Sequence, residues 1–316
     1  STILFNSMQE LYQHEKKIKK HQKISHYSYG RYGSSTTIEL ENMLKELEQA
    51  FHVFLTGTGF GGVALAIMSL CRPGDEIIVS DNVYGPTKEI SEKLLKEFNV
   101  TAKFYNPESF EDLKNKVTSK TKMILVENPG SNTFEFQDLS KIISLAKKKK
   151  IFTFLDNTWG TPLYLKPLKL GFDMSFSSAT KYFSGHSDAM GGSLAVNKKV
   201  FKQVMFFYKL SGYRMSADEA YLIIRGLRTL DTRLNQHYEN TKIVINFLKK
   251  QKKIKEILYP YKPSSKSYKL WKKYYSGATG LLSIVIKSKK KSSVIKFVNS
   301  LELFGIGYSW GGFESL

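Results

Sequence analysis

The chain has 316 residues, of which 41% are hydrophobic, so it can bury a large core and is not a disordered protein. Its 48 lysine and arginine residues against 28 acidic residues give a net charge of +20. Only six of the basic residues are arginine, the better reader of bases, and no nucleic-acid-binding motif is present. We therefore expect no specific nucleic-acid partner, and only weak nonspecific binding to polyanions stays open.

The cysteine content and the hydropathy of the chain also restrict its class. A single cysteine, Cys71, rules out an intramolecular disulfide and is compatible with a reducing cytoplasm. No apolar run is long enough to span a bilayer, and the N-terminus lacks a signal-peptide pattern. No cluster of His, Cys and carboxylate residues has metal-ligand spacing. We expect a soluble, cytoplasmic protein without a metal.

Predicted strands and helices alternate along most of the chain. The first thirty residues are polar and helix-like, and we interpret them as an arm. The expected strands are Val53–Leu55, Glu76–Ser80, Val100–Tyr105, Met123–Glu127, Ile151–Asp156, Met174–Ser178 and Ser193–Val196. The expected helices among them are Ile38–Phe51, one that follows Gly59, Thr87–Phe98 and Leu139–Lys149. This alternation predicts an α/β fold with a mostly parallel sheet covered by helices on both faces.

The last third of the chain predicts a smaller unit. A long helical pattern begins after Asp218 and continues to about Lys250, and a strand at Leu281–Ile286 and a helix at Ser292–Leu301 follow. We predict an N-terminal arm (1–31), a large domain (32–227) and a small α+β domain (228–316). The small domain has too few elements to cover its own sheet, so we expect it to be incomplete.

The most informative residue is Lys181, which follows an apolar strand and lies close to the hydroxyls of Ser178 and Thr180. Asp156 ends another strand about one βα unit upstream. Ligands of such sheets bind at the carboxyl ends of the strands, where Gly59, Asp156 and Lys181 all lie. A lysine in this place can form a Schiff base with an aldehyde, and Asp156 could keep a pyridine nitrogen protonated. The pattern suggests a pyridoxal-phosphate (PLP) enzyme.

Each neighbouring feature also has a simpler explanation. The glycine-rich turn at residues 56–62 could cradle a phosphate at a helix N-terminus, but a tight strand–helix turn explains it equally well. Tyr84 could stack on a flat ring or be a surface-turn residue. Asp156 could cap the segment that follows it or pair with one of the many lysines, and His186 is best explained as a hydrogen-bonded loop residue.

Together, the ordered motifs resemble the Cys/Met metabolism family of PLP-dependent enzymes over nearly the whole chain. The segments that carry the resemblance are Tyr29-Gly30-Arg31-Tyr32-Gly33, Asp156-Asn157-Thr158-Trp159, Ala179-Thr180-Lys181-Tyr182, Gly185-His186-Ser187-Asp188, Arg225-Gly226-Leu227-Arg228-Thr229-Leu230 and Tyr308-Ser309-Trp310-Gly311-Gly312. The lysine segment is specific for the family. The segment Tyr308–Gly312 is typical of its β-acting lyases rather than of the γ-acting relatives.

The resemblance implies a PLP-dependent transferase fold of type I and a role for each matching residue. Lys181 would hold PLP as a Schiff base, Asp156 would pair with the pyridine nitrogen, and Tyr84 would stack on the ring. The phosphate would be held by Gly59, Phe60, Ser178 and Thr180 and by the Tyr29 and Arg31 of a neighbouring subunit. The implied substrate contacts are Tyr29, Tyr84, Ser309 and Trp310.

The implied reaction is α,β-elimination of L-cystathionine to homocysteine, pyruvate and ammonia, a transsulfuration step of methionine biosynthesis. The alternatives are a γ-acting enzyme or a racemase on the same fold, or a non-catalytic basic binding protein. The resemblance also implies a homotetramer built from dimers that share their active sites. It further implies that the arginine that binds the substrate carboxylate would lie beyond Leu316, and that a short N-terminal lead would precede residue 1.

Overall fold

The protein is described by a computed structural model at residues 5–21, 29–263 and 265–316. Its centre is a seven-stranded sheet with the order β1-β7-β6-β5-β4-β2-β3. These strands are β1 (His52–Thr56), β2 (Glu76–Ser80), β3 (Thr101–Tyr105), β4 (Thr121–Glu127), β5 (Phe152–Asp156), β6 (Met174–Ser178) and β7 (Gly192–Val196). Only β7 runs against its neighbours, so the predicted mostly parallel sheet is confirmed.

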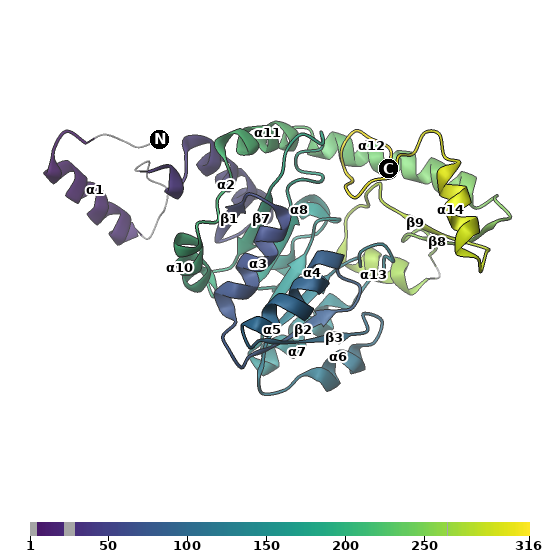
Figure 1. Ribbon diagram of the computed structural model, residues 1–316, viewed down its shortest axis with the longest axis horizontal. Helices are drawn as coiled ribbons and strands as arrows, with labels where there is room; N and C mark the ends of the chain where they lie inside the picture. The colour runs from purple at the N-terminus through teal and green to yellow at the C-terminus, as the bar shows by residue number, and fades with distance from the viewer. Residues whose placement is uncertain (1–4, 22–28, 264) are drawn as a thin grey trace.

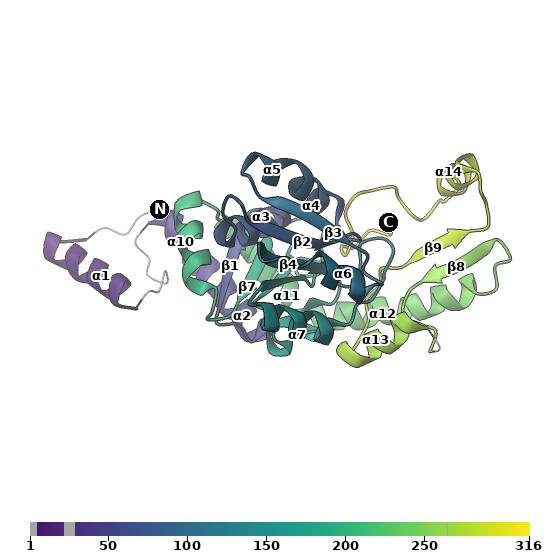
Figure 2. The same ribbon diagram turned by 90° about the horizontal axis from the view of Figure 1, so that it is seen from below.

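Helices lie on both faces of this sheet. The α-helices of the described residues, including those that lie away from the sheet, are α1 (Met8–His21), α2 (Ser35–Glu48), α3 (Gly59–Leu70), α4 (Gly85–Glu89), α5 (Leu95–Glu97), α6 (Phe110–Lys116), α7 (Leu139–Lys149), α8 (Thr161–Tyr164), α9 (Pro167–Leu170), α10 (Phe201–Ser211), α11 (Ala217–Leu227), α12 (Leu230–Leu248), α13 (Lys266–Tyr274) and α14 (Lys291–Asn299). Figure 2 shows α3, α4 and α5 on one side of the sheet and α2, α7 and α11 on the other.

The two faces of the strands are apolar, which is why the sheet is buried between helices. Along β4, Met123 and Leu125 pack into the core beneath α3, whereas Ile124 and Val126 pack into the core on the opposite face. Successive strand residues point to opposite faces, so a strand covered on both sides needs an unbroken apolar run. This packing places the carboxyl ends of the parallel strands at one end of the sheet.

Two elements extend from the body of the molecule in opposite directions. Figures 1 and 2 show α1 at one end, and α14 with a small two-stranded sheet at the other. The small sheet pairs β8 (Ile254–Leu258) with β9 (Ser283–Ile286) in antiparallel fashion. The division of the chain at residues 31 and 227 stays a prediction, although 227 coincides with the end of α11.

Several predicted boundaries were wrong. The helix expected at Ile38–Phe51 is Ser35–Glu48, because Ser34 and Thr37 form a capping box that starts it earlier. The helix expected at Thr87–Phe98 starts at Gly85 and contains a π turn, η2 (Ile90–Leu94). The long helix pattern predicted from after Asp218 to about Lys250 is divided into α11 and α12, and β8, α6, α10 and α13 were not predicted.

Glu48, the last residue of α2, is completely buried, and no hydrogen bond of normal geometry reaches its carboxyl oxygens from the described residues. Burial raises the pKa of Glu48 from 4.5 to about 7, although the nearby Ser175 hydroxyl and Lys166 ammonium oppose the shift. The folded protein therefore holds a proton that the unfolded chain releases above pH 4.5. This contribution to stability is complete below pH 4.5 and is lost as the pH rises to about 7.

The Glu48→Gln variant should lack this pH dependence. Relative to wild type, its free energy of unfolding should increase by about 3 kcal/mol between pH 4.5 and pH 8, because one pKa unit corresponds to about 1.4 kcal/mol. Urea unfolding at several pH values measures this difference. Glu46→Gln, at an exposed position of the same helix, is the control and should follow wild type. Parallel curves for Glu48→Gln and wild type would contradict the prediction.

Candidate active site

Polar side chains gather where the parallel strands end. Glu127 at the end of β4 is directly opposite Asp156 at the end of β5. Ser178 ends β6 and pairs with Gly192 of β7, which in turn pairs with Thr56 at the end of β1. The sheet order therefore places residues from distant parts of the sequence along one edge, as the sequence predicted for Gly59, Asp156 and Lys181.

Asp156 is connected to the neighbouring strand through Thr158. The Thr158 hydroxyl donates to Asp156 Oδ1 over 2.6 Å and accepts a hydrogen bond from the backbone N–H of Ser178 over 2.9 Å. The Thr158 backbone N–H also donates to Oδ1, so Asp156 does cap the segment that follows it. Burial raises the pKa of Asp156 from 3.8 to about 6, against these bonds. A cation that approaches Oδ2 would stabilise the ionised carboxylate.

Lys181 lies in the turn after β6, and its ammonium group meets the C-terminal segment. Nζ is 2.9 Å from the Ser309 Oγ and 5.2 Å from the centre of the Trp310 ring. The backbone there is closely packed, because a Cβ on Gly311 would lie 3.2 Å from the Tyr182 backbone nitrogen. Partial burial lowers the pKa of Lys181, which favours the neutral amine that can act as a nucleophile or base.

The turn before α3 forms a cradle beside Ser178. A Cβ on Gly59 would lie 2.5 Å from Ser178 Oγ, so only glycine allows this approach. Thr58 caps α3 by accepting from Gly61 N–H, which leaves the N–H groups of Gly59 and Phe60 at the open first turn of the helix. Backbone donors, a hydroxyl and a helix N-terminus together suit a phosphate group.

Tyr84 approaches the same edge from the loop after β2. Its side chain is 48% exposed, and its backbone N–H donates to Glu127 Oε2 over 2.6 Å. Sequence reasoning did not single out Glu127, although it ends an apolar strand in the same way as Asp156. Thr158 was also not singled out, because the bond from it to β6 depends on strand order.

Three predicted residues are engaged elsewhere in this chain. The Thr180 hydroxyl exchanges hydrogen bonds with the Gly191 backbone rather than facing an open space. Arg31 donates to the Lys209 carbonyl at the end of α10 and to the Tyr32 hydroxyl. Tyr29 is 53% exposed. No contact described for Tyr29 or Arg31 joins them to Lys181 of the same chain, so their predicted roles stay predictions.

The matching family model covers all of residues 1–316 and describes a Cys/Met metabolism PLP-dependent enzyme. The chain belongs to this family. It is 37% identical to a putative cystathionine β-lyase of Rhizobium johnstonii over 92% of this chain and 74% of that protein. It is 36% identical to an L-alanine/L-glutamate racemase of Wolbachia pipientis over 92% of this chain and 72% of that one.

A solved structure of cystathionine γ-synthase from Xanthomonas oryzae has the same architecture. It superimposes with a TM-score of 0.90 and 28% identity, over 99% of this chain and 78% of that one. The type I fold of PLP-dependent enzymes that the sequence predicted is therefore confirmed, and so is the cofactor class of the family, PLP.

The residues at the strand ends fit PLP. The site presents an amine with a lowered pKa, a recessed carboxylate, a cradle of backbone donors beside Ser178 and an exposed aromatic ring. These four groups match the aldehyde, the pyridine nitrogen, the phosphate and the flat ring of the cofactor, respectively. Thr158 connects Asp156 to Ser178, and the Lys181 backbone N–H donates to the Ser178 carbonyl over 3.1 Å. Glu127, opposite Asp156 in the sheet, accepts from the Tyr84 N–H.

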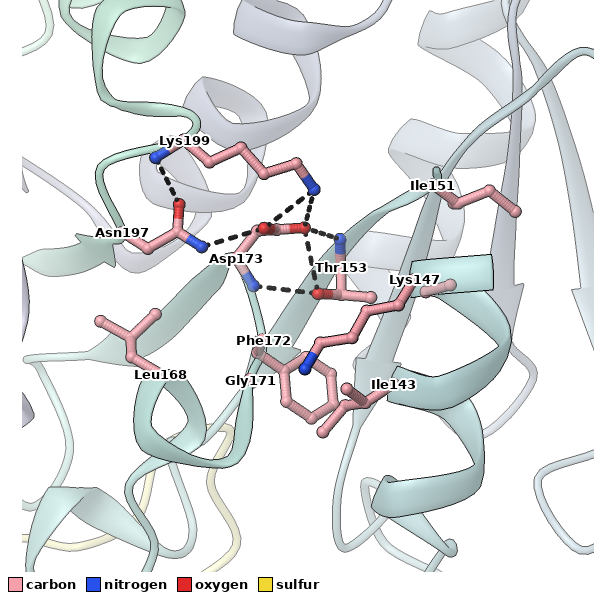
Figure 3. Close-up of a pocket in the computed structure, with 11 residues that line it drawn as sticks. Ile143, Lys147, Ile151, Thr153, Leu168, Gly171, Phe172, Asp173, Asn197 and Lys199 are labelled. Atoms are coloured by element: carbon pink, nitrogen blue, oxygen red, sulfur yellow. Dashed lines mark hydrogen bonds and ion pairs between the residues drawn. The ribbon is translucent and has the colours of Figure 1, made fainter. Parts of the chain in front are cut away.

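A cavity of about 360 Å³ at the opposite edge of the sheet has a structural explanation (Figure 3). There the buried carboxylate of Asp173 accepts hydrogen bonds from Thr153 N–H, Asn197 Nδ2 and Lys199 Nζ over 2.9 to 3.1 Å. The bonds join β5, β6 and the end of β7, and they satisfy the charge that is buried there. This cluster links the strands at the end of the sheet opposite the Lys181 site and does not belong to that site.

None of the helices within 5–21, 29–263 and 265–316 is long and apolar enough to cross a membrane. Within the same ranges, no group of three or more His, Cys, Asp or Glu side chains could hold a metal ion. Cys71 is buried at the end of α3.

Proposed function

We propose that the protein is a PLP-dependent carbon–sulfur β-lyase that cleaves L-cystathionine to homocysteine, pyruvate and ammonia. The observation that carries this proposal is the contact of Lys181 Nζ with Ser309 and Trp310. These two residues belong to the segment that is typical of the β-acting lyases. Their position beside the amine suits them to contact a substrate that reacts there.

PLP, when bound, supplies an electron sink that stabilises negative charge at the substrate Cα. In this proposal, Lys181 holds the cofactor, and its neutral amine then removes the proton from Cα. The same amine, now charged, gives that proton to the departing sulfur of homocysteine. Ser309 can accept a hydrogen bond from the charged ammonium, and it can donate to the lone pair of the neutral amine, so it can stay bonded to Nζ in both protonation states. The ring of Trp310 favours the charged state through its π face.

The remaining predicted residues would bind and orient PLP and the substrate. Asp156 would pair with the pyridine nitrogen, and Tyr84 would cover the ring. Gly59, Phe60 and Ser178 would hold the phosphate, with Thr180 once its hydroxyl turns from the Gly191 backbone. Tyr29 and Arg31 would complete the phosphate site of a neighbouring subunit, and Tyr29 would also contact its substrate, in a homotetramer of dimers. The exposure of Tyr29 supports this, because an exposed aromatic ring is free to contact another chain.

Product analysis tests the assignment directly. The purified protein is incubated with PLP and L-cystathionine, and the keto acid and the thiol are identified by mass spectrometry. Pyruvate with homocysteine supports β-elimination, whereas 2-oxobutyrate with cysteine shows γ-elimination and would overturn the proposal. A sample without substrate is the control for background keto acid.

A racemase is the second candidate, because the chain is 36% identical to an L-alanine/L-glutamate racemase. A racemase also removes the Cα proton, but it returns a proton to the same carbon and releases no sulfur compound. Chiral chromatography of L-alanine and L-glutamate after incubation distinguishes the two reactions. A D-amino acid without any pyruvate from cystathionine would favour the racemase.

A further inference from the structure

Glu127 lies beside the proposed cofactor site but has no role in the proposed elimination reaction. Its side chain is half-buried and directly opposite Asp156 in the sheet. Side chains in register on adjacent strands are about 5 Å apart. Glu127 therefore lies between Asp156, which we propose pairs with the pyridine nitrogen, and the loop that carries Tyr84.

Hydrogen bonds join the Tyr84 loop to the end of β4 and to the loop that follows it, where Asn82 Nδ2 donates to Glu135 Oε2 over 3.1 Å. Glu127 Oε2 accepts from the Tyr84 backbone N–H over 2.6 Å, and the Ser131 N–H donates to the Asn82 carbonyl over 2.8 Å. The Asn82 side chain packs against Gly130, where a Cβ would lie 2.0 Å from Nδ2. Of the two backbone hydrogen bonds, the one to Glu127 is the one made at the tyrosine itself.

The exposure of the Tyr84 ring makes this bond important. Tyr84 as a whole residue is 48% exposed, so packing alone does not fix the orientation of its side chain. Tyr84 immediately precedes α4, and its own side chain makes no capping hydrogen bond there. The position of the ring therefore depends on where its backbone is held.

We propose that Glu127 is a positioning residue of the cofactor site, which holds the Tyr84 backbone so that the aromatic ring covers the cofactor that Asp156 binds from below. The inference rests on the proposed roles of Tyr84 and Asp156. The proposed role of Glu127 depends on the length of its side chain more than on its charge. A carboxyl oxygen and an amide oxygen at the same place can both accept from the Tyr84 N–H.

The ionisation of Glu127 is consistent with this role. Burial and the neighbouring Asp156 carboxylate raise the pKa of Glu127, while the Tyr84 N–H and the Ser131 hydroxyl oppose the shift. Tyr275 also faces this pair, and Asp156 contributes to raising the pKa of that phenol. The raised pKa favours the protonated form of Glu127, whose carboxyl oxygen can still accept from the Tyr84 N–H.

Two conservative variants separate reach from charge. Glu127→Gln keeps the acceptor in place, so its dissociation constant for PLP should stay within about threefold of wild type. Glu127→Asp keeps an acid but is one methylene shorter, so it withdraws from the Tyr84 N–H and should bind PLP about tenfold more weakly. Affinity is measured by titrating the cofactor-free protein with PLP at pH 7.5 and following intrinsic fluorescence.

A double-mutant cycle shows whether Glu127 acts through the ring. In the Tyr84→Ala background, Glu127→Asp should change PLP affinity by less than about threefold, because no ring remains to be positioned. The control is Glu76→Gln, which alters a carboxylate at the opposite end of β2 and should bind PLP like wild type. Thermal unfolding of each cofactor-free variant shows that it is folded.

The inference is overturned if Glu127→Asp binds like wild type, if Glu127→Gln binds more weakly than Glu127→Asp, or if the effects of Glu127→Asp and Tyr84→Ala simply multiply. All of these outcomes are read from cofactor binding. A wrong substrate assignment under the proposed function would leave them unchanged, so the two hypotheses fail independently.

Discussion

Replacement of Lys181 by alanine is expected to reduce the elimination of L-cystathionine by a factor of about 1,000 or more. The variant loses the amine that holds PLP and the group that moves the proton from Cα to sulfur, and each function alone is worth about two to four orders of magnitude. Pyruvate formation at saturating PLP measures the loss. The fold should survive, because Lys181 is only partly buried and forms no ion pair within the described residues.

The matched control for Lys181→Ala is Lys148→Ala, on the exposed side of α7 near its end, which removes the same charge from a distant place. It should retain full activity. Borohydride reduction followed by peptide mass spectrometry should locate the cofactor on residue 181 in wild type and in the control. Pyruvate formation at an undiminished rate by Lys181→Ala would reject the assignment of this lysine.

Replacement of Asp156 by asparagine is the second large effect that we expect. Asparagine keeps an acceptor for the two hydrogen bonds from Thr158 but cannot pair with a protonated pyridine nitrogen. We expect elimination to slow by about 100-fold, in the range that removal of a charged partner from a reacting group produces. We also expect weaker PLP binding, because the ion pair between the carboxylate and the ring is lost.

The pH dependence of PLP binding provides an independent readout for Asp156. The pKa of this carboxyl is raised to about 6 in the cofactor-free protein, so below that pH it is protonated and offers no charge to the ring. The affinity of wild type should fall as the pH drops below about 6. The Asp156→Asn variant should bind weakly without this acid-side transition.

Asp75→Asn, in an exposed turn before β2, is the control for Asp156→Asn and should retain the acid-side transition of wild type. If Asp156→Asn shows the same transition as wild type, another group is responsible for the pH dependence, and the pairing of Asp156 with the pyridine nitrogen is rejected.

Part of this site could be predicted from the sequence because local pattern and chemistry agree there. Lys181 and Asp156 each follow an apolar strand, and strand ends are where such sheets bind ligands. Glu127 follows the same pattern but was not distinguished, because its role depends on which loop lies above β4. The bond from Thr158 to β6 and the contact of Ser309 with Lys181 join residues 20 and 128 positions apart, which no local pattern reveals.

The fold, like the site, could be predicted only in part from the sequence. Short, mostly apolar segments identified the seven central strands, since strands buried on both faces are rich in apolar residues. The pattern did not reveal that β7 runs antiparallel, because direction in a sheet depends on connections rather than on composition. It also missed β8, whose exposed Lys255 and Glu256 interrupt the apolar run, and the break at Arg228–Thr229 that separates α11 from α12.

The order of strands has a consequence for synthesis on the ribosome. β7 lies between β1 and β6, so β1 has no place in the sheet until β7 has been made. A nascent chain that ends before residue 192 already contains the glycine-rich turn, Asp156, Ser178 and Lys181. It lacks the strand that brings Gly59 beside Ser178. The phosphate cradle can therefore assemble only after β7 (Gly192–Val196) has emerged from the ribosome.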